Sequence, residues 1–90
     1  MAWRIKFERA AERELAKLGS DVAKRVLAFL HERVAKLENP RLIGEALKGS
    51  ELGDFWKYRV GDYRIIANIE DQTVQILIVR IGNRRDIHRR

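Results

Sequence analysis

Residues 55–64 read FWKYRVGDYR, in which aromatic and cationic side chains flank a Gly-Asp pair that begins at Gly61. This pattern predicts a β-hairpin, because a two-residue loop with glycine at its first position forms the type II′ turn that matches the twist of the strands. In this register Arg59 lies opposite Arg64, and the two-residue period of a strand places Lys57 on the same face. The sequence therefore predicts three cations on one face of a sheet.

Like charges that face each other across a strand pair destabilise a hairpin. A face that carries them is therefore either fully solvated or the binding site of an anion. Three of the aromatic residues of this stretch, Trp56, Tyr58 and Tyr63, alternate away from the cations. We expect them to pack in the core or within the hairpin rather than to stack on bases.

One strand and two helices are predicted ahead of the hairpin. Residues 2–7 alternate apolar and cationic side chains, as in a half-buried strand. Apolar residues then recur at helical spacing over residues 8–18 and again over residues 20–37, with a glycine stop between them. Residues 41–54 are a glycine-containing connection, in which we expect a turn of helix at residues 45–48.

Three strands follow this connection, at residues 54–60, 63–69 and 73–81. The last two are almost entirely apolar, which is typical of central strands. The order β-α-α-β-β-β predicts an α+β fold, in which a helical hairpin packs on one face of a small, mainly antiparallel four-stranded sheet. Residues 1–90 form a single domain in this interpretation.

The composition is that of a compact folded protein with a polyanionic partner. The chain has 90 residues, of which 46% are hydrophobic and 36% are charged, and its net charge is +6. The positive excess is concentrated late in the chain, because residues 57–90 hold eight Lys and Arg against four Asp and Glu. A basic protein of this kind suits RNA, DNA or an acidic protein segment.

The residue types that are absent or rare exclude several kinds of site. Without cysteine the chain has no disulfide, thiolate nucleophile or cysteine-bound zinc. Its two histidines, His31 and His88, are far apart in sequence and make a poor metal site, so we expect no metal and no other cofactor. The longest uncharged run, residues 72–79, is too short to span a membrane, and the N-terminus has no signal-peptide pattern. We therefore expect a cytoplasmic protein.

Three stretches of the chain resemble the RelE/ParE superfamily, the toxin half of bacterial and archaeal toxin–antitoxin pairs. They are the Leu-Lys-Gly at residues 47–49, the hairpin with the apolar residues after it at 56–67, and the segment IGNRRDIH at 81–88. The resemblance covers nearly the whole chain. It implies a RelE-like fold and a cognate RelB-like antitoxin that forms a hetero-oligomer with the toxin.

Two activities occur on this fold, so the resemblance leaves two functions open. RelE-like members cleave messenger RNA in the ribosomal A site without a metal, whereas ParE-like members poison DNA gyrase. RelE-type proteins carry basic residues at positions that match Lys57, Arg59, Arg64 and Arg84. These matches favour the nuclease, with the ribosome and mRNA as partners and no membrane. The alternative is a gyrase poison, or a toxin-like binding module without catalysis.

The resemblance implies a reaction in which the RNA supplies its own nucleophile, the 2′-hydroxyl, and is left with a 2′,3′-cyclic phosphate. Arg59 and Arg64 suit charge neutralisation, because a guanidinium stays protonated and binds phosphate oxygens through paired N–H donors. Lys57, which lies among other cations, is the candidate general base. Many RelE-like chains have a tyrosine near the C-terminus where this chain has His88. The proton for the leaving 5′-oxygen would come from His88 or, more indirectly, from Arg84.

Each of these roles has a simpler alternative. The three hairpin cations form a solvated face in one alternative, and in another they form the surface that an acidic antitoxin helix covers. The tail arginines Arg85, Arg89 and Arg90 are expected either to contact RNA phosphates without sequence specificity or to remain disordered.

Overall fold

The computed structural model describes residues 2–47 and 55–83. Two groups of residues that the sequence analysis singled out lie outside these ranges. They are Lys48 and Gly49, and the tail residues Arg84, Arg85, His88, Arg89 and Arg90.

The helices and strands follow the predicted order, with one strand added. The strands are β1 (Arg4–Phe7), β2 (Glu45–Ala46), β3 (Phe55–Val60), β4 (Tyr63–Glu70) and β5 (Gln75–Asn83), and the α-helices are α1 (Arg9–Lys17) and α2 (Ser20–Ala28). A π-helical segment, η1 (Phe29–Val34), continues α2, and two short 3-10 helices are η2 (Pro40–Ile43) and η3 (Asp71–Thr73). None of the helices in the described ranges has the length and hydrophobicity of a membrane span.

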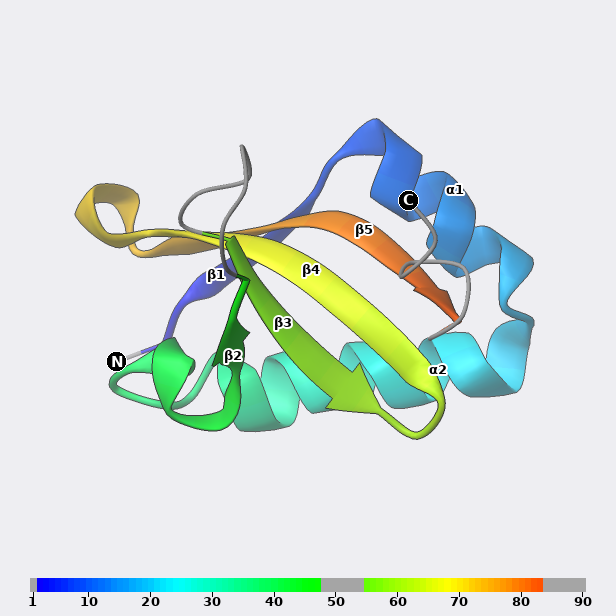
Figure 1. Cartoon of the computed structure of the whole chain (residues 1–90), viewed down its shortest axis with the longest axis horizontal. Helices are drawn as coiled ribbons and strands as arrows, with labels where there is room; N and C mark the ends of the chain where they lie inside the picture. The colour runs from blue at the N-terminus through cyan, green and yellow to red at the C-terminus, as the bar shows by residue number, and fades with distance from the viewer. Residues whose placement is uncertain (1, 48–54, 84–90) are drawn as a thin grey trace.

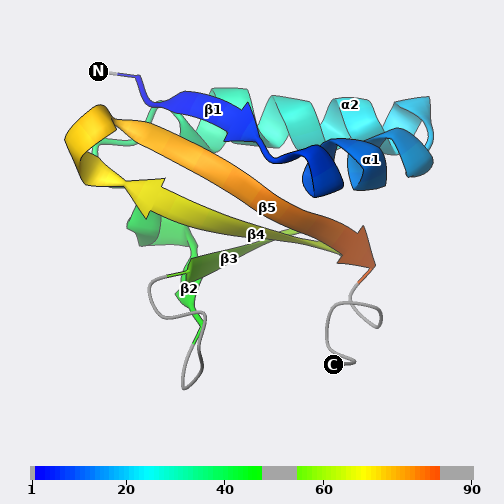
Figure 2. The same cartoon turned by 90° about the horizontal axis from the view of Figure 1, so that it is seen from above.

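A five-stranded mixed sheet forms one layer of the molecule, with the strand order β1-β5-β4-β3-β2. β1 runs parallel to β5, and the other neighbours are antiparallel. The helices α1 and α2 lie together on one side of this sheet (Figure 1), as the view from above in Figure 2 shows. The predicted α+β fold, with a helical hairpin on one face of a mainly antiparallel sheet, is therefore confirmed.

The predicted turn of helix at residues 45–48 and the count of four strands are wrong. Residues 45–46 instead form the edge strand β2, which pairs with Trp56 and Lys57 of β3. The backbone N–H of Leu47 also donates to β3, over 3.0 Å. A helical turn would leave this edge of β3 without backbone partners, whereas the short strand satisfies them.

The two helices are joined by a very tight turn at Gly19, as predicted. This glycine has a φ of 89°, a conformation that other residues rarely adopt, and α2 begins at the next residue. The helix predicted over residues 20–37 is confirmed through Val34. Its last turns are π-helical, with the N–H of Ala35 donating to the carbonyl oxygen of Leu30. Together α2 and η1 form one long helix along the sheet (Figure 1).

The hydrophobic core lies between this long helix and the sheet. Its fully buried side chains come from this helix and from the strands β3, β4 and β5. They are Val26, Leu30 and Val34 of the helix, and Tyr58, Ile65, Ile76, Ile78 and Ile81 of the strands. Tyr58 packs edge-on against Phe29 with ring centroids 6.1 Å apart, and its hydroxyl donates to the carbonyl oxygen of Pro40 over 2.6 Å. Trp56 packs against the same core. The prediction that these two hairpin aromatics pack inward is confirmed.

The hairpin between β3 and β4 has the predicted register. Val60 pairs with Tyr63, and Arg59 pairs with Arg64. Gly61 has a φ of 59°, whereas the φ of Asp62 is not positive. A type II′ turn requires this combination at its two central residues. This turn therefore fixes which side of the sheet each hairpin side chain occupies.

Candidate functional site

The predicted site residues Lys57, Arg59 and Arg64 lie on one face of the sheet. Arg59 pairs directly with Arg64 across β3 and β4, and Lys57 is two residues from Arg59 on the same strand. Their neighbours along the strands, Tyr58 and Ile65, belong to the core beneath the helices. Because side chains alternate along a strand, the three cations point away from α1 and α2. We refer to Lys57, Arg59 and Arg64 as the cationic face.

The three cations differ in how far solvent reaches them. Arg59 is exposed, the side chain of Lys57 is 15% exposed, and Arg64 is only 4% exposed. A buried guanidinium is costly unless its donors are satisfied, and in the described part of the chain no buried side-chain nitrogen or oxygen lacks a hydrogen-bond partner. Arg64 is therefore a cation held in place, whereas Arg59 is accessible to a ligand.

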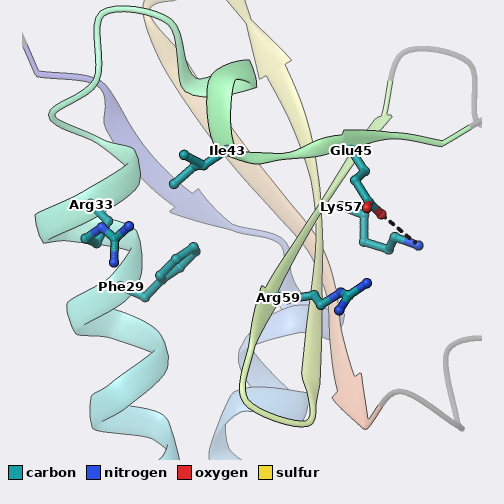
Figure 3. A pocket seen from close by; sticks show the side chains of 6 residues that line it. All are labelled: Phe29, Arg33, Ile43, Glu45, Lys57 and Arg59. Atoms are coloured by element: carbon teal, nitrogen blue, oxygen red, sulfur yellow. Dashed lines mark ion pairs between the residues drawn. The ribbon is translucent and has the colours of Figure 1, made fainter.

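A carboxylate lies beside Lys57. The Nζ of Lys57 is 3.5 Å from Oε1 of Glu45, whose side chain is 61% exposed (Figure 3). The sequence analysis placed Lys57 among cations only, because it treated residues 41–54 as a connection without strand pairing. The pairing of β2 with β3 sets Glu45 directly opposite Lys57. The carboxylate offsets the crowding of like charge that the hairpin sequence alone suggested.

A groove of about 410 Å³ lies beside this edge of the hairpin. Its lining residues come from the long helix, from η2 and from the strands β2 and β3; they are Phe29, Arg33, Ile43, Glu45, Lys57 and Arg59. In Figure 3, Phe29 and Arg33 extend from the helix, while the side chains of Lys57 and Arg59 point away from them on the other side of β3. The groove therefore connects an apolar surface of the helix with the border of the cationic face.

Tyr58 lies between the cationic residues in sequence but is not part of their chemistry. Burial raises the pKa of Tyr58 to about 12, and the charge of Arg41 opposes this rise with a smaller effect. The hydroxyl is therefore protonated at neutral pH, and it donates to the carbonyl oxygen of Pro40. Within residues 2–47 and 55–83, no group of three or more His, Cys, Asp or Glu side chains is arranged to hold a metal ion.

Comparison with known proteins gives the family. The sequence model of the family described as ParE toxin of type II toxin-antitoxin system, parDE, matches residues 5–88 of the chain. The match includes both helices and every strand of the cationic face. The chain belongs to the RelE/ParE superfamily of toxins.

Individual relatives of this RelE/ParE toxin agree with the family match. Toxin RelG of Mycobacterium tuberculosis is 30% identical over 90 residues, which cover 100% of both chains. The mRNA interferase toxin RelE of Escherichia coli is 31% identical over 84 residues, which are 93% of this chain and 85% of the relative. A chain in the crystal structure of the toxin–antitoxin complex RelBE2 from Mycobacterium tuberculosis matches with a TM-score of 0.83 and 26% identity, covering 93% of each chain. The resemblance seen in the sequence is confirmed, and the fold of this toxin is RelE-like.

The sequence analysis missed one cation of this RelE/ParE toxin. Arg80 on β5 pairs with Ile66 on β4, which itself pairs with Lys57 on β3. Its side chain therefore starts from the same face of the sheet as the three hairpin cations. The signal in the sequence was a single charge within an otherwise apolar strand. The other proposed site residues, Arg84 and His88, follow β5 outside the described ranges, and their roles stay predictions.

Proposed function

We propose that this toxin is a ribosome-dependent endoribonuclease, which cleaves messenger RNA in the ribosomal A site by attack of the RNA 2′-hydroxyl and without a metal ion. The observation that carries the proposal is the cationic face, where Lys57, Arg59 and Arg64 point to one side of two neighbouring strands. The likeness to the mRNA interferase toxin RelE of Escherichia coli supports it. The site of action is the cytoplasm, where ribosomes and messenger RNA are found.

The proposed reaction defines what the protein has to supply. The 2′-oxygen forms a bond to the adjacent phosphorus, and the bond between this phosphorus and the 5′-oxygen of the next nucleotide breaks. One proton leaves the 2′-hydroxyl, and another is delivered to the departing 5′-oxygen. Between these events the phosphoryl oxygens carry additional negative charge, which preorganised cations stabilise.

Arg64 and Arg59 are the proposed stabilisers of that charge. Arg64 is 4% exposed, so it is already held in place before the RNA arrives and needs little reorganisation. Arg59 pairs with it across the hairpin and is exposed, so it is able to adjust to the phosphate. An arginine is a poor general base, because a guanidinium in a protein does not give up its proton at neutral pH.

Lys57 is the proposed general base. In the free protein its Nζ is 3.5 Å from Oε1 of Glu45. To act as the base, Lys57 has to leave this contact and release one ammonium proton to solvent, after which the neutral amine accepts the proton of the 2′-hydroxyl. His88 is the proposed donor to the 5′-oxygen, and Arg84 is the alternative that acts more indirectly. Arg85, Arg89 and Arg90 are proposed to contact RNA phosphates.

We infer further that this toxin binds a cognate RelB-like antitoxin and forms a hetero-oligomer with it. The inference is supported by the similar chain from Mycobacterium tuberculosis, which was crystallised in a toxin–antitoxin complex. An acidic antitoxin segment would complement the excess of positive charge in residues 57–90.

The test is cleavage of a defined messenger RNA on ribosomes with an empty A site, compared with the same RNA without ribosomes. We expect cuts at fixed positions within the A-site codon, new 3′ ends with a cyclic phosphate, and no cleavage of the free RNA. A chelator selective for transition metals, added while the Mg²⁺ that ribosomes require is held constant, should leave the rate unchanged. Intact RNA after incubation with folded, antitoxin-binding protein would contradict the proposal.

Lys57→Ala tests the site within this assay. We expect the cleavage rate to fall by at least about 100-fold, the usual contribution of a general base. Lys24→Ala is the matched control, because Lys24 is exposed on α2 and lies outside the cationic face. Circular dichroism and antitoxin binding should be unchanged in both variants. Wild-type cleavage by Lys57→Ala would remove the proposed role of Lys57.

Poisoning of DNA gyrase is the second candidate function. It is favoured by the family description itself, which names the ParE toxin, and by His88 in the position where many RelE-like chains have tyrosine. Cleaved DNA–gyrase complexes should then accumulate when the toxin is incubated with purified gyrase and supercoiled plasmid. Ribosome-bound messenger RNA should stay intact. The absence of any effect on gyrase would eliminate this candidate.

A further inference from the structure

The cation on β5 lies in line with Lys57 across three strands. Lys57 pairs with Ile66 on β4, and Ile66 pairs with Arg80 on β5. Because neighbouring strands are about 4.8 Å apart, the backbones of Lys57 and Arg80 are separated by about 10 Å. Both side chains start from the side of the cationic face, and the Arg80 guanidinium turns from there to the edge of β5, where it meets α1. Arg80 therefore extends this face to a third strand.

Glu14 of α1 holds Arg80 at the rim of the sheet. Nε of Arg80 donates to Oε2 of Glu14 over 3.0 Å, and the backbone N–H of Ile81 donates to Oε1 of the same carboxylate over 2.7 Å. β1 pairs with β5 only as far as Ile78, so this N–H lies beyond the end of the neighbouring strand. The carboxylate is thus fixed at both oxygens, and it fixes the guanidinium in turn.

The contact with Glu14 leaves most of the Arg80 guanidinium available. A guanidinium has five N–H donors, and Glu14 accepts from one of them. No other group in the described part of the chain accepts from Arg80, and its side chain is 48% exposed. The two terminal amino groups therefore present the fork that binds phosphate oxygens.

We propose that Arg80 is a further RNA-binding residue, which contacts a backbone phosphate of RNA bound on the cationic face, and that Glu14 is the positioning residue that orients it. This proposal rests on the proposed ribonuclease function. An arginine that is already held by a carboxylate loses less side-chain entropy when it binds its ligand. The position on β5, level with Lys57, puts this contact on the same strand of RNA as the reacting phosphate.

The salt dependence of RNA binding tests the phosphate contact. The probe is a fluorescein-labelled single-stranded 2′-O-methyl RNA, which has no free 2′-hydroxyl and is not cleaved. We expect Arg80→Gln to weaken binding about tenfold, as for one charge-assisted hydrogen-bonded contact, and to lower the slope of log K against log salt by about 0.7. Arg13→Gln is the control, because Arg13 is exposed on α1 next to Glu14 and should change neither value. An unchanged slope in Arg80→Gln overturns the phosphate contact.

Glu14→Gln tests the positioning role separately. Arg80 keeps its charge in this variant, so we expect an unchanged salt slope together with about threefold weaker RNA binding. Arg80→Lys should likewise keep the slope and fail to restore the affinity, because an ammonium lacks the planar fork. Thermal unfolding curves identify any variant that does not fold. Tighter RNA binding by Glu14→Gln would show that the carboxylate competes with RNA, and would overturn its positioning role.

Cleavage on ribosomes separates a failure of this inference from a failure of the proposed function. We expect Arg80→Gln to raise the protein concentration that gives half-maximal cleavage and to leave the maximal rate within about twofold. Wild-type protein that binds the RNA probe but cleaves nothing refutes the nuclease, and the salt slope of Arg80→Gln then decides the inference alone. In the contrary outcome, Arg80→Gln binds the RNA probe and cleaves ribosome-bound messenger RNA as the wild type does, but binds the antitoxin more weakly. This result would overturn the inference and assign Arg80 to the antitoxin surface.

Discussion

Val74 is a β-branched residue in a left-handed backbone conformation. It is the one non-glycine residue with positive φ in the described ranges, with φ of 51° and ψ of 52°. Its N–H donates to the carbonyl oxygen of Asp71, and its own carbonyl oxygen accepts from the N–H of Arg4. These bonds close the turn between β4 and β5 and fasten β1, so the surrounding structure holds Val74 in a conformation that costs about 1–2 kcal/mol.

At position 74, the glycine variant should therefore be more stable than the alanine variant, which is the reverse of the usual order. We expect Val74→Gly to have a free energy of unfolding about 1 kcal/mol higher than that of Val74→Ala, because both remove the side chain but only glycine adopts positive φ without strain. At Ala28, exposed within the long helix, glycine should instead be less stable than alanine by about 1 kcal/mol. Urea unfolding of the variants gives both differences. Equal stability of the two variants at position 74 would contradict the strain.

Tyr58 gives the stability of this toxin a dependence on alkaline pH. Its pKa is raised from 10.0 to about 12 by burial, so the unfolded chain loses the phenolic proton at lower pH than the folded chain. The contribution of Tyr58 to stability is fully present below about pH 10 and is lost as the pH rises toward 12. We expect wild type to lose about 2–3 kcal/mol relative to Tyr58→Phe between pH 9.5 and pH 12, measured by urea unfolding. A constant difference between the two proteins would contradict this linkage.

Among the elements of the fold, the hairpin was predictable from sequence because its geometry is local. Gly61 fixes the turn, the turn fixes the register, and the register places Arg59 opposite Arg64. The helix stop at Gly19 was predictable for the same reason. Such features depend on backbone preferences within a few residues.

The missed features depend on contacts between distant segments. β2 is two residues long and has no alternating pattern of its own, so only its pairing with β3 identifies it as a strand. The carboxylate of Glu14 reaches Arg80 and Ile81 across 66 and 67 residues of sequence. Nothing in the spacing of a helical glutamate and a strand arginine indicates that they meet. The candidate site was therefore predictable within the hairpin but not at its two borders.

Gly61→Ala tests whether the turn sets the hairpin. Gly61 has a φ of 59°, and a Cβ at this position would lie 3.2 Å from Nη2 of Arg25. We expect the substitution to lower the free energy of unfolding by about 1–2 kcal/mol, because a side chain is strained in this conformation. Asp62→Ala, at the exposed second position of the turn, should change stability by less than about 0.5 kcal/mol. Equal unfolding curves for the two variants would contradict the type II′ assignment.

At the scale of the whole molecule, the sheet is completed when β1 pairs with β5, which is far from it in sequence. β1 pairs with β5 in parallel, with Arg4 opposite Gln75 and Phe7 opposite Ile78. Contacts across so many residues require closure of a long loop before they contribute, so we expect them to form late in folding. The rest of the sheet is built from antiparallel neighbours that follow one another in the chain.

Ile5→Ala tests this order of events. Ile5 is half-buried on β1, pairs with Ile76 and packs against the core, so we expect its loss to cost about 2 kcal/mol. If β1 docks late, most of this cost appears as about 10- to 30-fold faster unfolding, while refolding slows by less than about threefold. Stopped-flow fluorescence measures both rates, and Lys6→Ala, an exposed neighbour, should change neither. A refolding rate reduced by the full amount would show that β1 docks before the transition state.

The pairing of β1 with β5 also determines when the nascent chain is able to complete its fold during translation. A nascent chain that has not yet produced β5 has no strand neighbour for β1 and lacks Arg80 at the border of the cationic face. The hairpin alone, without β5, which joins it to β1, lacks the complete core that packs beneath it. The cationic face and its border at Arg80 are therefore complete only after β5 has been synthesised. Until then, the ribosome that synthesises the chain carries an incomplete toxin.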